Sequence, residues 1–123
     1  MDRVKWINHQ GKEILLIDYS GLKSSKNKNE ILGIIETFKD TALKKGGKIL
    51  FLSDVTNAYT DREVFSELKN EAKFCADNDL IEKECIVGVT GVKKALVNIV
   101  NRFAKTNLVL FNSREEAKSW LIE

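Results

Sequence analysis

The amino-acid sequence predicts a single α/β domain over residues 1–123, with a mixed sheet of about five strands, about four helices and the element order ββαβαβαβα. Three observations lead to this fold class. Strand-like apolar runs alternate with amphipathic helical segments, which favours parallel strands joined by right-handed crossovers. The first two strands are separated only by a short turn with a glycine, which favours an antiparallel hairpin. A length of 123 residues is typical of one domain.

The opening hairpin comes from residues 3–19. Residues 3–9 alternate between apolar and polar side chains, as expected of a half-buried strand, and residues 12–19 form a more continuous apolar strand. Gln10 and Gly11 supply the turn between them.

A polar loop precedes the first helix. Asn27 and Glu30 have the spacing of a capping box, which predicts a helix that begins near residue 28. Two lysines followed by Gly46 and Gly47 predict its end, because cations suit the last turn and glycine tolerates positive φ. The expected buried face contains Ile31, Ile34, Ile35, Phe38 and Ala42.

The third strand, residues 48–54, is a continuous apolar run, as expected of a strand covered on both faces. Thr60 and Glu63 form a second capping-box pattern and predict the start of the second helix. Phe74 is expected on the face opposite to the buried one. The expected buried stripe of this helix contains Phe65, Leu68, Ala72, Cys75 and Ala76.

The remaining elements repeat the alternation. Residues 83–89 form a fourth strand, and residues 107–111 form a short last strand. Ser113 and Glu116 form a third capping box, before a final helix docked by Ala117, Trp120 and Leu121. The helix between the fourth and the last strand carries an apolar stripe of Val92, Ala95, Leu96, Ile99, Val100 and Phe103.

Composition excludes several function classes. The chain is 43% hydrophobic and 31% charged, which is typical of a globular protein. A net charge of +2 gives no signature of nucleic-acid binding. Cys75 and Cys85 have no metal-binding spacing and are expected to be buried and reduced. No apolar run approaches the roughly 20 residues of a membrane span, so we expect a cytoplasmic protein. We also expect no metal and no cofactor.

Two strand-to-helix turns carry the polar residues of most interest. In open α/β sheets, ligands bind outside the carboxyl ends of the strands. If the third and fourth strands are parallel neighbours, the two turns share one edge and form a candidate interaction surface. The alternative is that these residues only satisfy the backbone of their own turns. The candidate interaction edge consists of Asp54, Thr56, Asn57, Thr90, Gly91 and Lys93.

No arrangement for catalysis is evident. His9 is the single histidine, and it lies at the end of a strand beside a turn. A nucleophile–histidine pair would need Ser53 or Cys85 beside it, which the order of elements does not require. We therefore expect the protein not to be an enzyme.

Four segments together resemble a known family. They are IDYSGL, SDVTN, CIVGVTGVKK and FNSREEAKSWL. In this combination the chain resembles the bacterial STAS-like family, which is similar to the anti-sigma factor antagonist domain and to the lipid-binding CRAL-TRIO fold. The resemblance covers nearly the whole chain. It implies a regulatory domain that acts by binding an as yet unknown protein partner, without catalysis.

The antagonist branch of that family is phosphorylated on a serine in a motif similar to Asp-Ser-Ser-Gly. On this chain Asp54 matches the aspartate, Val55 the first serine, Thr56 the second serine and Asn57 the glycine. The usual acceptor is the first serine, and valine has no oxygen to phosphorylate. The resemblance thus implies a domain without the usual phosphoacceptor.

The lipid-binding branch implies an alternative function, in which a cleft between the sheet and the helices holds a small hydrophobic molecule. Phe65, Leu68, Val97 and Phe103 are the candidate lining residues, although the same side chains suit a plain core. Val97 and Ala104 lie beside the main stripe of their helix, and this surplus of apolar positions would suit a cleft or a homodimer interface.

Overall fold

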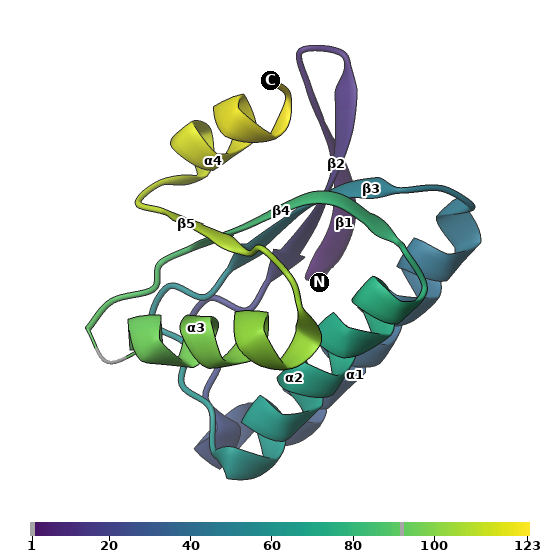
Figure 1. The fold of residues 1–123 in the computed structure, drawn as a ribbon. Helices are drawn as coiled ribbons and strands as arrows, with labels where there is room; N and C mark the ends of the chain where they lie inside the picture. Colours follow the sequence, from purple (N-terminus) through teal and green to yellow (C-terminus); the bar gives the residue numbers. More distant parts are fainter. Residues whose placement is uncertain (1, 92) are drawn as a thin grey trace.

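The computed structural model describes residues 2–91 and 93–123. In these residues five strands and four helices follow one another in the predicted order ββαβαβαβα (Figure 1). The elements are β1 (Val4–His9), β2 (Lys12–Asp18), α1 (Ser24–Lys45), β3 (Ile49–Asp54), α2 (Arg62–Asp77), β4 (Ile81–Val87), α3 (Lys93–Ala104), β5 (Val109–Phe111) and α4 (Arg114–Leu121).

The strands form one mixed sheet in the order β1-β2-β3-β4-β5. β1 and β2 pair antiparallel, with Val4 opposite Ile17 and His9 opposite Lys12. The other three pairs are parallel. The predicted hairpin followed by parallel crossovers is therefore confirmed. The parallel register brings the carboxyl ends of β2, β3 and β4 to the same edge of the sheet.

The sheet is the middle layer of three. Helices α1, α2 and α3 cover one face, and α4 lies on the other (Figure 1). Side chains alternate along a strand, so Leu15 and Ile17 join the core with α1 and α2, while Ile14 and Leu16 join the smaller core with α4. β3 is buried along its whole length, which confirms its prediction as a strand covered on both sides.

Helix α1 begins earlier than predicted, at Ser24 instead of near residue 28. Asn27 has non-helical dihedrals, and its side chain accepts a hydrogen bond from the N–H of Lys23. The capping-box pattern therefore marks a kink inside α1 and not the start of the helix. The extra turn is held by tertiary contacts. The Ser24 N–H donates to the carbonyl of Tyr59, and the Ser24 hydroxyl accepts from the N–H of Asp61. The predicted end is confirmed, because Gly46 adopts a left-handed conformation after two lysines.

The start of α2 was predicted one residue too early. Asp61, not Thr60, is the N-cap, and its carboxylate accepts a hydrogen bond of 2.9 Å from the N–H of Val64. Lys28 of α1 lies 2.7 Å from the same carboxylate. The Ser113 cap of α4 is confirmed, since its hydroxyl accepts from the N–H of Glu116.

The predicted stripe of α2 is confirmed in part. Cys75 is buried and Leu68 packs against the core, whereas Ala76 is exposed. Phe74 is not on a free outer face, because it packs against the core and the Lys39 ammonium lies 5.3 Å from its ring centre. The apolar pattern predicted the helix and most of its inner face, but it missed Val64 and Glu71, which are also buried.

The buried residues of α3 also differ from its predicted stripe. Val97 and Ala104, which seemed surplus, are the buried residues of this helix among those described. Ile99 and Phe103 of the predicted stripe are 44% and 45% exposed. Val92, also assigned to that stripe, lies outside the described residues.

Candidate functional site

A cavity of about 360 Å³ lies between the sheet and helices α2 and α3. Its walls are mostly apolar. This volume falls within the range of about 300–1,000 Å³ that is usual for small-molecule sites. The apolar lining includes Phe51, Val55, Phe65, Leu68, Ile86, Leu96, Val97, Val100 and Leu108.

Residues on the inner faces of α2 and α3 line this space. α3 buries only Val97 and Ala104 among its described residues, and it turns Leu96 and Val100 toward the cavity. Of the predicted cleft residues, Phe65, Leu68 and Val97 line the cavity. Phe103 does not, because it lies on the outer side of α3, where the Lys69 ammonium is 5.0 Å from its ring centre.

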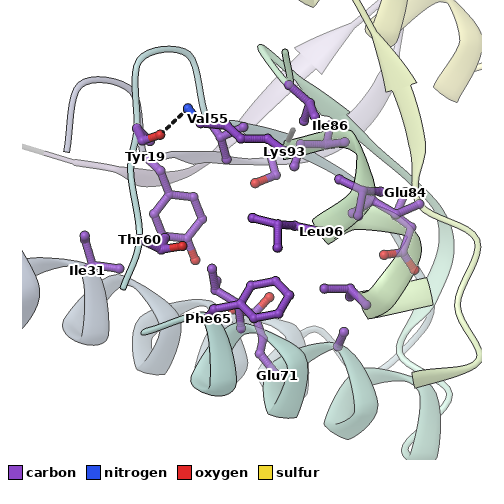
Figure 2. A pocket seen from close by; sticks show the side chains of 18 of the residues that line it. Tyr19, Ile31, Val55, Thr60, Phe65, Glu71, Glu84, Ile86, Lys93 and Leu96 are labelled. Carbon is purple, nitrogen blue, oxygen red and sulfur yellow. Dashed lines mark hydrogen bonds between the residues drawn. The ribbon is translucent and has the colours of Figure 1, made fainter. Parts of the chain in front are cut away.

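Among the polar side chains that interrupt the apolar lining are two carboxyl groups and a phenol. Glu71 comes from α2, Glu84 from β4, and Tyr19 from the segment that follows β2. Figure 2 shows Tyr19 and Glu71 directed into the space under α3, with Glu84 entering it from the opposite wall. Tyr19 and Glu71 are only 6% and 8% exposed. The Tyr19 hydroxyl and the Glu71 Oε2 atom have no partner of good hydrogen-bond geometry among the described residues, but the two groups are close enough that each shifts the pKa of the other.

Burial dominates the acid–base properties of these groups. It raises the pKa of Glu71 to about 8, and the neighbouring Glu84 carboxyl adds to the rise. Burial also raises the pKa of Glu84 to about 7. The pKa of Tyr19 is raised well above its usual value by burial and by the Glu71 carboxyl. At neutral pH burial therefore favours the protonated form of Glu71, while Glu84 lies near the midpoint of its titration.

One end of the cavity reaches the surface at Tyr59, which is 55% exposed. Lys93, at the start of α3, lies across this end. Its ammonium donates a hydrogen bond to the carbonyl of Ala58 and sits 3.9 Å from the centre of the Tyr59 ring (Figure 2). Lys93 thus links α3 to the segment between β3 and α2 at the mouth.

The predicted interaction edge lies next to this mouth, and Asp54 forms its buried part. Asp54 is 6% exposed, and one carboxylate oxygen accepts from the N–H and hydroxyl of Thr56 at 2.9 and 2.7 Å. The other oxygen accepts from the Arg114 Nε at 2.7 Å. Arg114 also approaches Asp18 at 3.5 Å. Through Arg114, this network of hydrogen bonds and ion pairs links α4 to the carboxyl ends of β2 and β3.

The rest of that edge is more open. Asn57 is exposed and has a positive φ of 57°, while Thr90 and Gly91 are exposed on the neighbouring turn. The two turns adjoin, since a Cβ placed on Gly88 would lie within 2.7 Å of the Thr56 backbone. The two turns are therefore neighbours, as expected for parallel strands, and Asp54 and Thr56 are hydrogen-bonded to each other.

The chain resembles the crystal structure of an uncharacterised protein of the DUF3478 family from Shewanella loihica PV-4, which has a SpoIIAA-like fold. The match has a TM-score of 0.66 and 16% sequence identity, and it covers 96% of this chain and 91% of the other. The fold is SpoIIAA-like. Searches among protein families and among curated proteins gave no match.

This likeness confirms the STAS-like architecture predicted for the sequence. Within the SpoIIAA-like domain, Val55 occupies the position that the resemblance assigned to a phosphoacceptor. Val55 lines the cavity, and the adjacent Thr56 hydroxyl donates to Asp54. Neither side chain offers a free hydroxyl at this position.

The candidate catalytic residues are far apart. His9 lies at the hairpin end of β1, whereas Ser53 pairs with Ile17 on β2, which in turn pairs with Val4. Five residues of strand, roughly 17 Å, separate His9 from that position. Cys75 and Cys85 are free and buried, as predicted. The described residues contain no cluster of three or more metal-ligating side chains and no helix long and apolar enough to cross a bilayer.

The sequence reasoning missed the polar groups of the cavity. Glu71 lies three residues after Leu68 and four before Cys75, a spacing that places a carboxylate on the inner face of α2. Glu84 directly precedes the apolar run that starts at Cys85. Both signals were present, but charged residues are usually assigned to solvent, since unpaired burial is costly.

Proposed function

We propose that this SpoIIAA-like domain binds a small, mainly apolar molecule in the cavity under α2 and α3, as a non-enzymatic carrier or sensor. The observation that carries the proposal is the cavity itself, which has mostly apolar walls and a few converging polar groups. Such a combination is typical of small-molecule sites, because the apolar walls supply affinity and the polar groups fix orientation.

The position of the cavity also supports binding. Its accessible end adjoins the carboxyl ends of β3 and β4, where α/β sheets usually bind ligands. At this end Lys93 makes a cation–π contact with Tyr59 and one hydrogen bond to the Ala58 carbonyl, so movement of the Lys93 side chain would widen the entrance for a ligand.

The test is binding of N-phenyl-1-naphthylamine, a neutral dye whose fluorescence rises in apolar surroundings. Ala72 lines the cavity, so Ala72→Phe should fill it and weaken dye binding by about tenfold or more. Ala95→Phe is the matched control, since Ala95 is exposed and lies outside the cavity lining. Equal affinity in both variants, or no dye binding by the wild type, would exclude this function.

A second candidate function is protein binding at the edge formed by Asn57, Thr90 and Gly91. The observation in its favour is that these exposed residues lie on two adjoining turns beside the cavity mouth. A partner there could sense whether the cavity is filled. Asn57→Lys and Thr90→Lys should then remove a partner captured by the wild-type protein. Retention of every partner by both variants would rule out this edge.

A further inference from the structure

The inner wall of the cavity holds hydrogen-bonding atoms that the described residues leave unpaired. The Tyr19 hydroxyl and the Glu71 Oε2 atom are buried and face the cavity. A buried polar atom without a partner costs free energy. The same atoms are well placed to contact a polar group that enters with a ligand.

The nearby bases already have partners within the protein. Of the described residues that line it, Lys93 is the only base, and it donates to Ala58 at the mouth. Lys39 of α1 influences Glu71, but its ammonium lies 3.3 Å from Glu36 and against the Phe74 ring.

The groups that act on Glu71 come from three packed elements and from the segment after β2. They are Glu84 of β4, Lys39 and Glu36 of α1, Cys75 of its own helix and Tyr19. Glu71 and Glu84 can add only negative charge to the inner wall when they ionise, so a ligand carboxylate finds no opposite charge there. A protonated amine would meet two carboxyl groups and a phenol oxygen, all able to accept its hydrogen bonds.

We propose that the cavity selects amphiphilic amines, with the alkyl chain against the apolar walls and the ammonium group held by Glu71, Glu84 and the Tyr19 hydroxyl. This inference rests on the ligand-binding function proposed above. It goes further by naming the headgroup and the residues that recognise it.

Binding of an ammonium group to a protonated carboxyl group releases a proton. The ammonium keeps its own protons, the carboxyl O–H bond breaks, and the proton passes to solvent, leaving a carboxylate–ammonium ion pair. At pH 6.5 the amine is already charged, and burial keeps Glu71 protonated. Up to one proton per bound amine should therefore appear in the buffer.

The test uses decylamine, decanol and decanoic acid, three probes with the same chain and different headgroups. Calorimetry at pH 6.5 should show decylamine binding about tenfold more tightly than either of the others. Titration in phosphate and in imidazole, which differ in ionisation enthalpy, measures the released proton. Glu71→Gln should abolish the preference for the amine. Glu67→Gln on the same helix is the matched control, because Glu67 does not line the cavity.

Each outcome decides between the two proposals. Equal or tighter binding of decanol or decanoic acid, or binding of decylamine without proton release by the wild type, would overturn the amine inference and leave the apolar site intact. A preference for decylamine that survives in both Glu71→Gln and Glu84→Gln would also overturn the amine inference. Failure of all three probes and of the neutral dye would remove the ligand-binding function as well. Proton release when the wild-type protein binds decylamine tests the amine inference even if a variant does not fold.

Discussion

Glu71 is a carboxyl group buried in an apolar wall without a base to neutralise it. Its burial has a direct consequence for stability, because its pKa is raised from 4.5 to about 8 in the folded chain. Between these values the folded protein holds the proton more tightly than the unfolded chain does. The free energy of unfolding therefore falls as pH rises from about 4.5 to about 8.

Glu71→Gln should remove this contribution, because an amide does not ionise. We expect the variant to gain stability relative to wild type as pH is raised from 4.5 to 8, by on the order of 1–3 kcal/mol. Urea unfolding at the two pH values measures the change. Glu84, with a pKa of about 7, keeps its own contribution in the variant. A constant difference between variant and wild type at both pH values would contradict the burial of an ionisable Glu71.

Asp54 shows the opposite situation, a buried carboxylate whose oxygens are all engaged. Asp54→Ala would remove its bonds from the Thr56 N–H, the Thr56 hydroxyl and Arg114. We expect a loss of about 2–3 kcal/mol of unfolding free energy, since bonds to charged groups are among the stronger ones. Thermal or urea unfolding measures it.

The matched comparison is Asp61→Ala, which removes an exposed helix cap and should cost about 1 kcal/mol. If Asp54→Ala proved no more damaging than Asp61→Ala, the network around Arg114 would not stabilise the fold. The expected loss also makes Asp54→Ala unsuitable as a probe of the interaction edge, because a lost partner could then reflect a weakened fold.

At the scale of elements, the close approach of two turns depends on Gly88. It has a φ of +91°, and a Cβ there would lie 2.6 Å from the Thr56 nitrogen and 2.7 Å from its Cα. The absence of a side chain at Gly88 therefore lets the turn after β4 lie directly against the turn after β3. A side chain at this position would push the turns apart and disturb the edge beside the cavity mouth.

Gly88→Ala should therefore lower the unfolding free energy by at least about 2 kcal/mol, through the strained φ and the overlap with Thr56. Gly33→Ala is the control, because Gly33 lies inside α1 with no neighbouring atom within 4 Å of a Cβ. That change should instead stabilise by about 0.5–1 kcal/mol, since alanine favours helix. Equal effects of the two substitutions in urea unfolding would refute the close packing of the turns.

At the scale of the whole molecule, contacts between distant parts of the chain close the fold around the sheet. The Lys12 ammonium donates to the carbonyl of Ile122, 110 residues away, and Lys83 donates to the carbonyl of Trp120. Arg114 joins α4 to the ends of β2 and β3. On the face of the sheet under α4, apolar side chains form the smaller core. The cavity lies on the opposite face, which α2 and α3 cover.

A ligand in that cavity should stabilise the whole domain, because it binds the folded chain and not the unfolded one. At a free concentration 100 times its dissociation constant, decylamine should add about 2.7 kcal/mol, a rise of roughly 8–12 °C in Tm for a domain of this size. Differential scanning fluorimetry measures the shift. Ala72→Phe should lose the response and Ala95→Phe should keep it. An unchanged Tm in the wild type at saturating amine would contradict binding to the folded state.

Much of this architecture could be predicted from local patterns. The order of strands and helices, the opening hairpin, the end of α1 at Gly46 and the Ser113 cap all depend on residues within a few positions of one another. Hydrophobic period and turn chemistry act over the same short range. For this reason they predicted the elements and, through the crossover rules, the sheet.

The choice of which side chains of α2 and α3 become buried depended instead on tertiary packing. Two apolar stripes compete on α3, and only the approach of α2 and the sheet buries Val97 and leaves Ile99 exposed. The same packing leaves the cavity between these elements and places Glu71 in its wall. Local sequence thus determines which elements form, because backbone hydrogen bonds and side-chain periodicity are local. Packing between distant elements determines which faces meet, and with them the polar site inside the apolar cavity.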